Sequence, residues 1–303
     1  MMELRGRVLL WHNCHDGSGD DPFGRAAWWR ADDGPDVLFD RAMTLYEALG
    51  DRAVHIINQP AGKLPRSSGH IVSAAHVWSM PRERRLALMR VMSSLAGNDV
   101  PLGAYIGLRV WSHLDVRTPR NHAMSLPSRR PDVFLPTVAS LAAAGAGVIF
   151  FDLASNTSSD RDPVGTTAND VRHDLIGYVS TELSQLGCVA GGEAIPHDNG
   201  ELAFASAHAP WLASAEHLDR QSDPDRSWRA EGRTLFVHFR SGDADPRETP
   251  ERPYTEDDVA DFVDRGFGIS IGLTRTGVVP AKFRDIVTRL TTDAMRSEEA
   301  AAA

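Results

Sequence analysis

Residues 131–152 read PDVFLPTVASLAAAGAGVIFFD, a helix-length segment followed by a short apolar run that ends in an acidic residue. The Pro-Asp pair is typical of a helix start, and Gly145 lies where the helix is expected to end. The apolar run predicts a buried strand at 147–152. Only two residues connect this helix to this strand, and such short connections are typical of parallel β/α architecture.

The same unit recurs along the whole chain. Short runs rich in Val, Ile, Leu and Phe alternate with segments of helical character, and eight such strands are the number that closes a (β/α)8 barrel. The predicted strands are 7–11, 53–58, 102–110, 147–152, 188–193, 210–214, 235–239 and 268–273. The predicted helices are 37–49, 82–95, 133–144, one from 167 or 169 to 186, 259–264 after a first turn with three acidic residues, and 280–295.

The connections differ between the two ends of the predicted barrel. Long polar segments follow the strands, whereas the connections from helix to strand are short. Enzymes with this fold work at the end with the long segments. A barrel takes about 250 residues, so we expect one domain over residues 1–303, with a core at about 7–295 and a frayed tail at 296–303. The competing fold, a doubly wound sheet, is disfavoured because no glycine-rich phosphate-binding motif follows the first strand.

Composition excludes several classes of protein. The chain has 303 residues, of which 42% are hydrophobic and 24% charged, as in an ordinary globular protein. Its 32 basic and 41 acidic residues give a net charge of −9, so no nucleic-acid partner is expected. No apolar run reaches the roughly 18 to 20 residues of a membrane span, and no signal-peptide pattern is present. We expect no membrane partner and a location in the cytoplasm or in a larger particle, and the oligomeric state stays open.

Acidic residues end the fourth and fifth predicted strands. Asp152 closes one and Glu193 closes the other. Neighbouring strands lie about 4.8 Å apart, so the two carboxylates are expected within several ångströms of each other. Glycoside hydrolysis needs such a pair, one as acid and one as nucleophile or base. Glu216, after the sixth predicted strand, is a third candidate catalytic residue, and helix capping or pairing with an arginine is the alternative role for each acid.

Aromatic and polar residues near the same strand ends are candidate substrate-binding residues. Sugar rings pack their flat C–H faces on aromatic rings, and their hydroxyl groups need hydrogen-bond partners. The candidates are Trp11, His12, Asn58, Arg109, Trp111, Trp211, His238 and Asp243. Filling of the core is the alternative role for each tryptophan.

The segment 11–16, Trp-His-Asn-Cys-His-Asp, raises a metal-dependent hydrolase as an alternative. Two residues separate His12 from His15, whereas the metal-dependent amidohydrolases have His-x-His, and no Asp ends the eighth predicted strand. We therefore expect no metal ion and no cofactor. The two cysteines, Cys14 and Cys188, are expected at opposite ends of the barrel, too far apart for a disulfide, so both are predicted to be free thiols.

Over about residues 7–290 the chain resembles the TIM-barrel glycoside hydrolases. The acids at the ends of the fourth and fifth strands resemble those of the α-amylase clan, and this resemblance implies Asp152 as nucleophile or base and Glu193 as general acid. Phe150 stands where that clan has an arginine, and 238–243 reads HFRSGD where the clan has Asn-His-Asp, so no subfamily is implied. A glycosidase that cleaves an oligo- or polysaccharide is the leading hypothesis. A catalytically silent barrel, binding carbohydrate or building a larger assembly, and a metal-dependent hydrolase are the alternatives.

Overall fold

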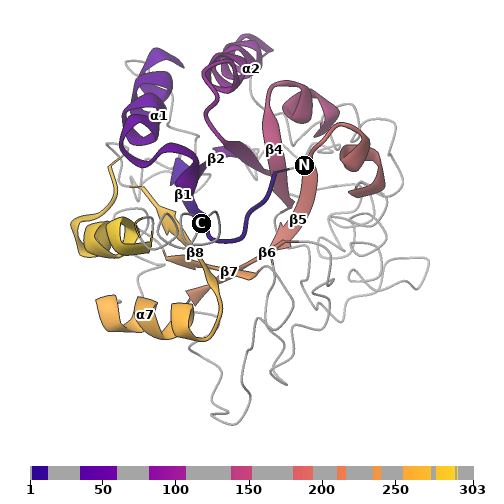
Figure 1. The fold of residues 1–303 in the computed structure, drawn as a ribbon. Coiled ribbons are helices and arrows are strands. Elements are labelled where there is room, and N and C mark those ends of the chain that lie inside the picture. Colours follow the sequence, from indigo (N-terminus) through magenta and orange to yellow (C-terminus); the bar gives the residue numbers. More distant parts are fainter. Residues whose placement is uncertain are drawn as a thin grey trace, which may run out of the picture.

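The described strands form one closed barrel (Figure 1). The computed structural model describes residues 2–12, 35–59, 82–106, 138–151, 180–193, 210–215, 235–239, 255–273, 278–290 and 292. Each strand pairs in parallel with the next along the chain, and β8 closes the barrel by pairing with β1. This is the (β/α)8 architecture that the alternation of apolar runs and helical segments predicts.

The strand bounds agree closely with those expected from the sequence. The strands are β1 (Val8–His12), β2 (Ala53–Gln59), β3 (Leu102–Ile106), β4 (Ala146–Phe151), β5 (Val189–Glu193), β6 (Trp211–Ser214), β7 (Leu235–Phe239) and β8 (Gly268–Gly272). All bounds lie within one residue of the predicted ones, except at the end of β3, where 107–110 lie outside the described residues.

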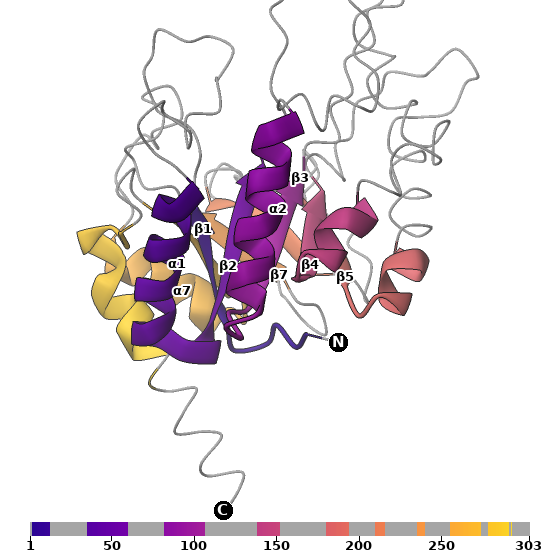
Figure 2. The ribbon, with the colours of Figure 1, turned by 90° about the horizontal axis from the view of Figure 1, so that it is seen from above.

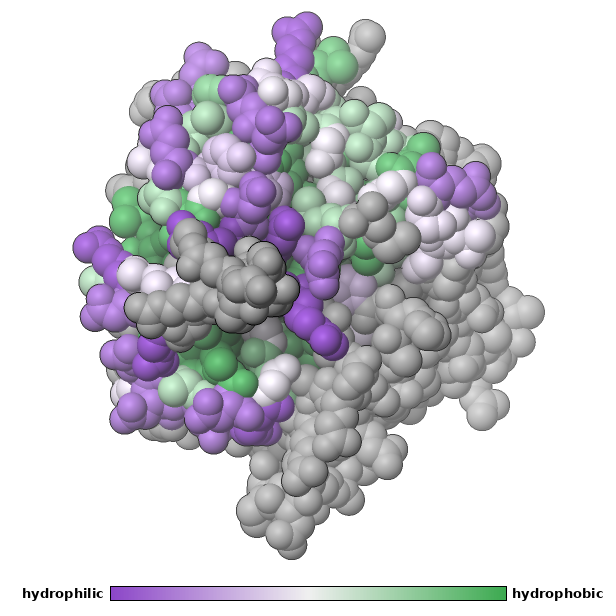
Figure 3. Space-filling view, in the orientation of Figure 1, coloured by the Kyte–Doolittle hydropathy of each residue, from purple (hydrophilic) through white to green (hydrophobic). Residues whose placement is uncertain are grey.

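Helices cover the outside of the barrel (Figures 1 and 2). They are α1 (Pro35–Leu49), α2 (Arg82–Ala96) and α7 (Glu256–Asp264), with 3₁₀ turns at η2 (Gly50–Arg52) and η6 (Ala281–Phe283) and further helical residues at 138–143, 180–185 and 284–290. On the face shown in Figure 3, hydrophilic residues lie over the outer sides of α1 and α7. No helix in the described ranges is long and apolar enough to cross a membrane.

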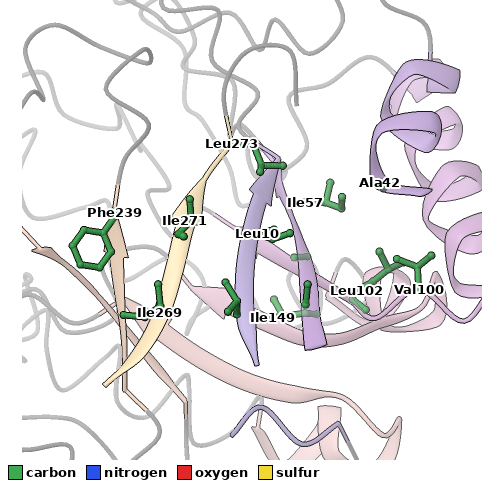
Figure 4. Packing of buried hydrophobic residues seen from close by; sticks show 14 of the residues in the cluster. Leu10, Ala42, Ile57, Val100, Leu102, Ile149, Phe239, Ile269, Ile271 and Leu273 are labelled. Atoms are coloured by element: carbon green, nitrogen blue, oxygen red, sulfur yellow. The ribbon is translucent and has the colours of Figure 1, made fainter. Parts of the chain in front are cut away.

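One set of strand side chains packs against the helices. Because successive side chains of a strand point to opposite faces, every second residue shares this outer layer. Leu10 of β1 and Ile57 of β2 belong to it, in one buried cluster with Ala42 of α1 and Leu88 of α2 (Figure 4). This layer joins the sheet to its helices and forms the larger of the two apolar clusters.

The alternate residues fill the barrel interior. They form a second cluster that contains no residue from a helix: Leu9, Trp11, Val54, Ile56, Val148, Phe150, Leu212 and Phe236 from the strands, with Leu4. Bulky side chains on one strand occupy space left by a glycine on the next. A Cβ atom added to Gly191 of β5 would lie 2.8 Å from the Phe150 ring, and one added to Gly268 of β8 would lie 2.5 Å from the Phe236 ring. The interior is therefore a packed core and not a pore.

Replacing Gly191 with alanine is expected to lower the free energy of unfolding by about 2 kcal/mol, since overpacking of a core costs about 1–3 kcal/mol. The added methyl group would lie 2.6 Å from the carbonyl oxygen of Pro210, a backbone atom that cannot turn away. Urea unfolding measures the change. Gly97→Ala is the control, because its nearest neighbour would be 3.3 Å away. Equal stability of the two variants would contradict this packing of the interior.

The segment before β1 closes the amino end of the barrel. It crosses that end of the strands in Figure 1, and Leu4 is buried in the interior cluster. Met2 packs against the same cluster, and its side chain occupies the space beside Gly147. The amide of Arg7 donates to the carbonyl of Leu4, which folds the segment back into β1. The interior is thus capped by apolar side chains at the end opposite to the carboxyl ends of the strands.

Leu4→Ala is expected to destabilise the protein by about 2 kcal/mol, the low end of the cost of truncating a buried leucine. The reason is the loss of apolar contact at the closed end of the barrel. Thermal unfolding followed by circular dichroism would show the change. In Leu86→Ala the same truncation falls on a side chain that is 46% exposed, so a much smaller effect is expected. An unaltered midpoint in Leu4→Ala would show that this segment adds nothing to the core.

Candidate functional site

Three aromatic rings meet inside the barrel, in the half nearer to the carboxyl ends of the strands. Trp11, Tyr105 and His238 are each the fourth of five residues in β1, β3 and β7. The Trp11 ring lies 4.6 Å from Tyr105 and 4.6 Å from His238, centroid to centroid, with tilted planes. These strands alternate around the barrel, and side chains of alternate strands form one layer of such an interior. The layer lies toward the carboxyl ends of the strands, the end at which enzymes with this fold carry their sites.

Two polar groups distinguish this layer from an ordinary core. His238 Nδ1 lies 3.0 Å from the hydroxyl of Ser270 on β8, and both residues are buried. The indole N–H of Trp11 is also buried and has no hydrogen-bond partner in the described part of the chain. A buried donor without a partner costs about 1–3 kcal/mol. Such a donor inside a polar, aromatic layer is a place where a ligand or water can bind.

His12 lies on the other face of the sheet. It is buried in the helix-facing layer, where its Nε2 atom is 3.0 Å from Nδ1 of His55 and the two rings stack at 5.2 Å. Burial lowers the pKa of His55 to about 4, and burial, the neighbouring His55 and the cation of Arg41 hold the pKa of His12 well below its usual value. Both imidazoles are therefore neutral at pH 7. The structure does not bring His12 together with Trp11 and His238 in the interior.

Trp211 also belongs to the helix-facing layer. Its side chain is fully buried in the cluster that joins the strands to the helices. Its indole N–H has no hydrogen-bond partner among the described residues. The structure thus separates the two tryptophans of the described strands, with Trp11 in the interior and Trp211 against the helices.

The backbone register places the ends of β4 and β5 side by side. Phe151, the last residue of β4, pairs with Gly192, and Glu193 is the last residue of β5. Asn58 lies in β2 and pairs with Tyr105 in register. The remaining candidates fall outside the described residues: Asp152, Glu216, Arg109, Trp111 and Asp243.

Sequence reasoning did not single out Tyr105, Ser270 or His55. All three have polar side chains and lie within strands. Because successive side chains of a strand point to opposite faces of the sheet, the apolar neighbours of each residue indicate the face on which it lies. Tyr105 and Ser270 are close to the interior histidine and tryptophan, whereas His55 is on the helix side. Polar residues buried inside predicted strands were therefore the overlooked clue.

Within the described ranges, no group of three or more His, Cys, Asp or Glu side chains is arranged to hold a metal ion. Cys188 is free and buried, which confirms the prediction for this thiol, and burial raises its pKa to about 12. A thiol with so high a pKa is a poor nucleophile at neutral pH. Cys14 lies outside the described residues.

Comparison with known proteins supports the fold. The chain is a (β/α)8 barrel, the TIM-barrel fold. It resembles a structure of L-ribulose 3-epimerase with a TM-score of 0.52 and 11% identity, covering 98% of each chain. It also resembles a quadruple mutant of α-N-acetylgalactosaminidase from Bifidobacterium bifidum, with a TM-score of 0.54 and 10% identity, over 95% of this chain and 49% of the other. No protein-family model matches the chain, and no curated protein matches its sequence.

Proposed function

We propose that this protein is a carbohydrate-acting barrel enzyme that hydrolyses a glycosidic bond with Asp152 and Glu193. The register of β4 and β5 carries this proposal, because Phe151 pairs with Gly192. Asp152 directly follows Phe151 in the sequence, and Glu193 directly follows Gly192. Consecutive Cα atoms are about 3.8 Å apart and adjacent strands about 4.8 Å apart. Two carboxyl groups attached to such neighbouring positions can span the roughly 5 to 10 Å that glycosidases use.

In this proposal the two acids take different roles. Glu193 donates a proton to the glycosidic oxygen as the bond to the anomeric carbon breaks. Asp152 either attacks that carbon, giving a glycosyl ester that water then hydrolyses, or removes a proton from the water that attacks it. The first route retains the anomeric configuration and needs carboxyl groups about 5 Å apart, whereas the second inverts it and needs about 6.5–9.5 Å. Glu216 is the substitute if one of the two proves structural.

The interior layer supports a sugar as the substrate. Trp11 and His238 supply aromatic surface close to the strand ends, and Trp11 also has an indole N–H without a partner in the described part of the chain; this suits a ligand with both C–H faces and hydroxyl oxygens. Asn58, Arg109, Trp111 and Asp243 complete the proposed binding residues, whereas the buried positions of His12 and Trp211 against the helices favour a role in the core. Both similar structures carry names of enzymes that act on sugars.

A sugar epimerase is the second candidate function. The similarity to L-ribulose 3-epimerase extends over 98% of both chains, whereas this chain spans about half the length of the galactosaminidase. An acid pair at the carboxyl ends of β4 and β5 could remove a proton from a carbon beside a carbonyl group and return one on the other face. Such a reaction breaks no glycosidic bond, so products distinguish it from hydrolysis.

The test is to incubate the purified full chain with a panel of nitrophenyl glycosides and oligosaccharides, and separately with free ketoses in deuterated water. Hydrolysis predicts release of reducing sugar from at least one glycoside. Epimerisation predicts an altered ketose that has gained one deuterium. Samples before and after treatment with a chelator test the metal-dependent alternative. Absence of turnover on the whole panel, together with binding of an oligosaccharide by calorimetry, would replace both proposals with a silent binding barrel.

A further inference from the structure

The contact between Ser270 and His238 bears on which nitrogen of the imidazole ring carries the proton. The two residues are directly paired in the register of β7 and β8, and the Ser270 hydroxyl lies 3.0 Å from Nδ1 of His238. Ser270 is completely buried and His238 almost so. A hydroxyl group and a neutral imidazole can share this hydrogen bond in two ways, with either partner as the donor.

The hydrogen-bonding needs of the Ser270 hydroxyl favour one of these two arrangements. In the described part of the chain, the Ser270 hydroxyl has no hydrogen-bond partner besides His238. If His238 Nδ1–H donated, the Ser270 O–H would be a completely buried donor without an acceptor, which costs about 1–3 kcal/mol. If Ser270 donates, both atoms are satisfied by the one bond. The second arrangement also excludes a doubly protonated ring, since Nδ1 then holds no proton.

We propose that Ser270 is a positioning residue that donates its proton to Nδ1 and thereby holds His238 as the Nε2–H tautomer. His238 then acts in the barrel interior as a hydrogen-bond donor and not as a general base. Its role toward substrate rests on the proposed carbohydrate-acting function. In that reaction the base and acid steps fall to the carboxylates, and His238 holds the adjoining Trp11 ring in place.

The neighbouring tryptophan points to the same ligand chemistry. Trp11 contacts the His238 ring, and its indole N–H, which can only donate, is buried without a partner among the described residues. This N–H selects ligand atoms that accept hydrogen bonds. The chain's net charge of −9 does not favour an anion, so hydroxyl oxygens of a neutral sugar are the proposed acceptors.

The test reads the tautomer directly by NMR. The full chain is labelled with ¹⁵N-histidine and studied at about pH 8, above the usual imidazole pKa of about 6.5. Signals that disappear in His238→Gln belong to His238. The expected wild-type pattern is Nε2–H with Nδ1 unprotonated. Ser270→Ala is expected to change this pattern, whereas Ser270→Thr, which keeps the hydroxyl, restores it. Ser184→Ala removes an exposed serine hydroxyl bonded only to its own helix and is the matched control.

The outcomes separate the tautomer from the activity. A wild-type Nδ1–H pattern, or a pattern unchanged in Ser270→Ala, overturns the proposal even if the protein is an active glycosidase. Where Ser270→Ala does not fold, Ser270→Cys replaces it, because a thiol is similar in shape but a weak donor. In an active enzyme, Ser270→Ala is expected to raise KM several-fold with little change in kcat, and an unchanged KM overturns the role toward substrate. Lack of any activity contradicts the proposed function and leaves the NMR result valid.

Discussion

Glu193→Gln is expected to lower the rate of glycosidic cleavage by about 10²–10⁴-fold, because a positioned general acid contributes a factor of that size. The amide cannot donate a proton to the departing oxygen. The loss should be smaller for a nitrophenyl glycoside, whose leaving group needs little protonation, than for an oligosaccharide. Asp152→Asn should lose activity equally on both substrates, since it removes the nucleophile or base. Comparison of kcat/KM on the two substrate types thus assigns a role to each acid.

The controls for these variants are the same substitutions at exposed sites. Glu182→Gln and Asp285→Asn alter exposed acidic side chains on the helices and should keep wild-type kcat/KM. The midpoint temperatures of thermal unfolding of all four variants should lie close to that of the parent. Lost activity then cannot be explained by unfolding. Full activity in both Glu193→Gln and Asp152→Asn would end the two-carboxylate proposal.

Acid is expected to destabilise the fold through the buried histidine pair, His12 and His55. The pKa of His55 is about 4 in the folded protein against 6.5 ordinarily, since burial disfavours the charged ring. As pH falls below 6.5, the unfolded chain binds a proton that the folded chain does not, so stability falls by about 1.4 kcal/mol per pH unit. The loss amounts to about 3 kcal/mol by pH 4 and is absent above pH 7. The lowered pKa of His12 acts in the same direction.

Urea unfolding at several pH values between 7.5 and 4 measures this effect. The matched variant is the double substitution His12→Phe and His55→Leu, which fills the same buried layer without an ionisable group. Between pH 7.5 and pH 4 its free energy of unfolding should fall by at least about 3 kcal/mol less than that of the parent, because His55 alone accounts for that amount and His12 adds to it. Parallel curves for the two proteins would show that the pair is not the source of acid sensitivity.

Much of the fold could be predicted because strand and helix periods are local properties. The acidic first turn of α7 is an example, since Thr255 and Asp258 form the reciprocal capping bonds that its sequence favours. The face on which a lone aromatic residue lies is harder to predict. Trp211 starts a short strand in which both faces carry apolar residues, so its position against the helices follows only from the packing of its neighbours.

The candidate site was predictable to the extent that it depends on strand ends. The pairing of Asp152 with Glu193 is a prediction from the sequence, because each ends an apolar run; the described register of β4 and β5 reaches as far as Phe151 opposite Gly192. The bond between His238 and Ser270 could not be predicted, because it depends on which residues of β7 and β8 lie opposite each other. The stacking of His12 on His55 likewise needs the register of β1 and β2.

The pairing of β1 with β8 has a consequence for synthesis of the chain. β1 is synthesised before the other seven strands. One of its edges can pair only after β8, residues 268–272, has been synthesised. At about 5–20 residues per second, that edge waits for tens of seconds on the ribosome. The apolar segment at Met2 and Leu4 waits as well, since its burial site is the closed barrel. An unfinished chain therefore presents both an open strand edge and an exposed apolar segment, which are the features that chaperones shield from aggregation.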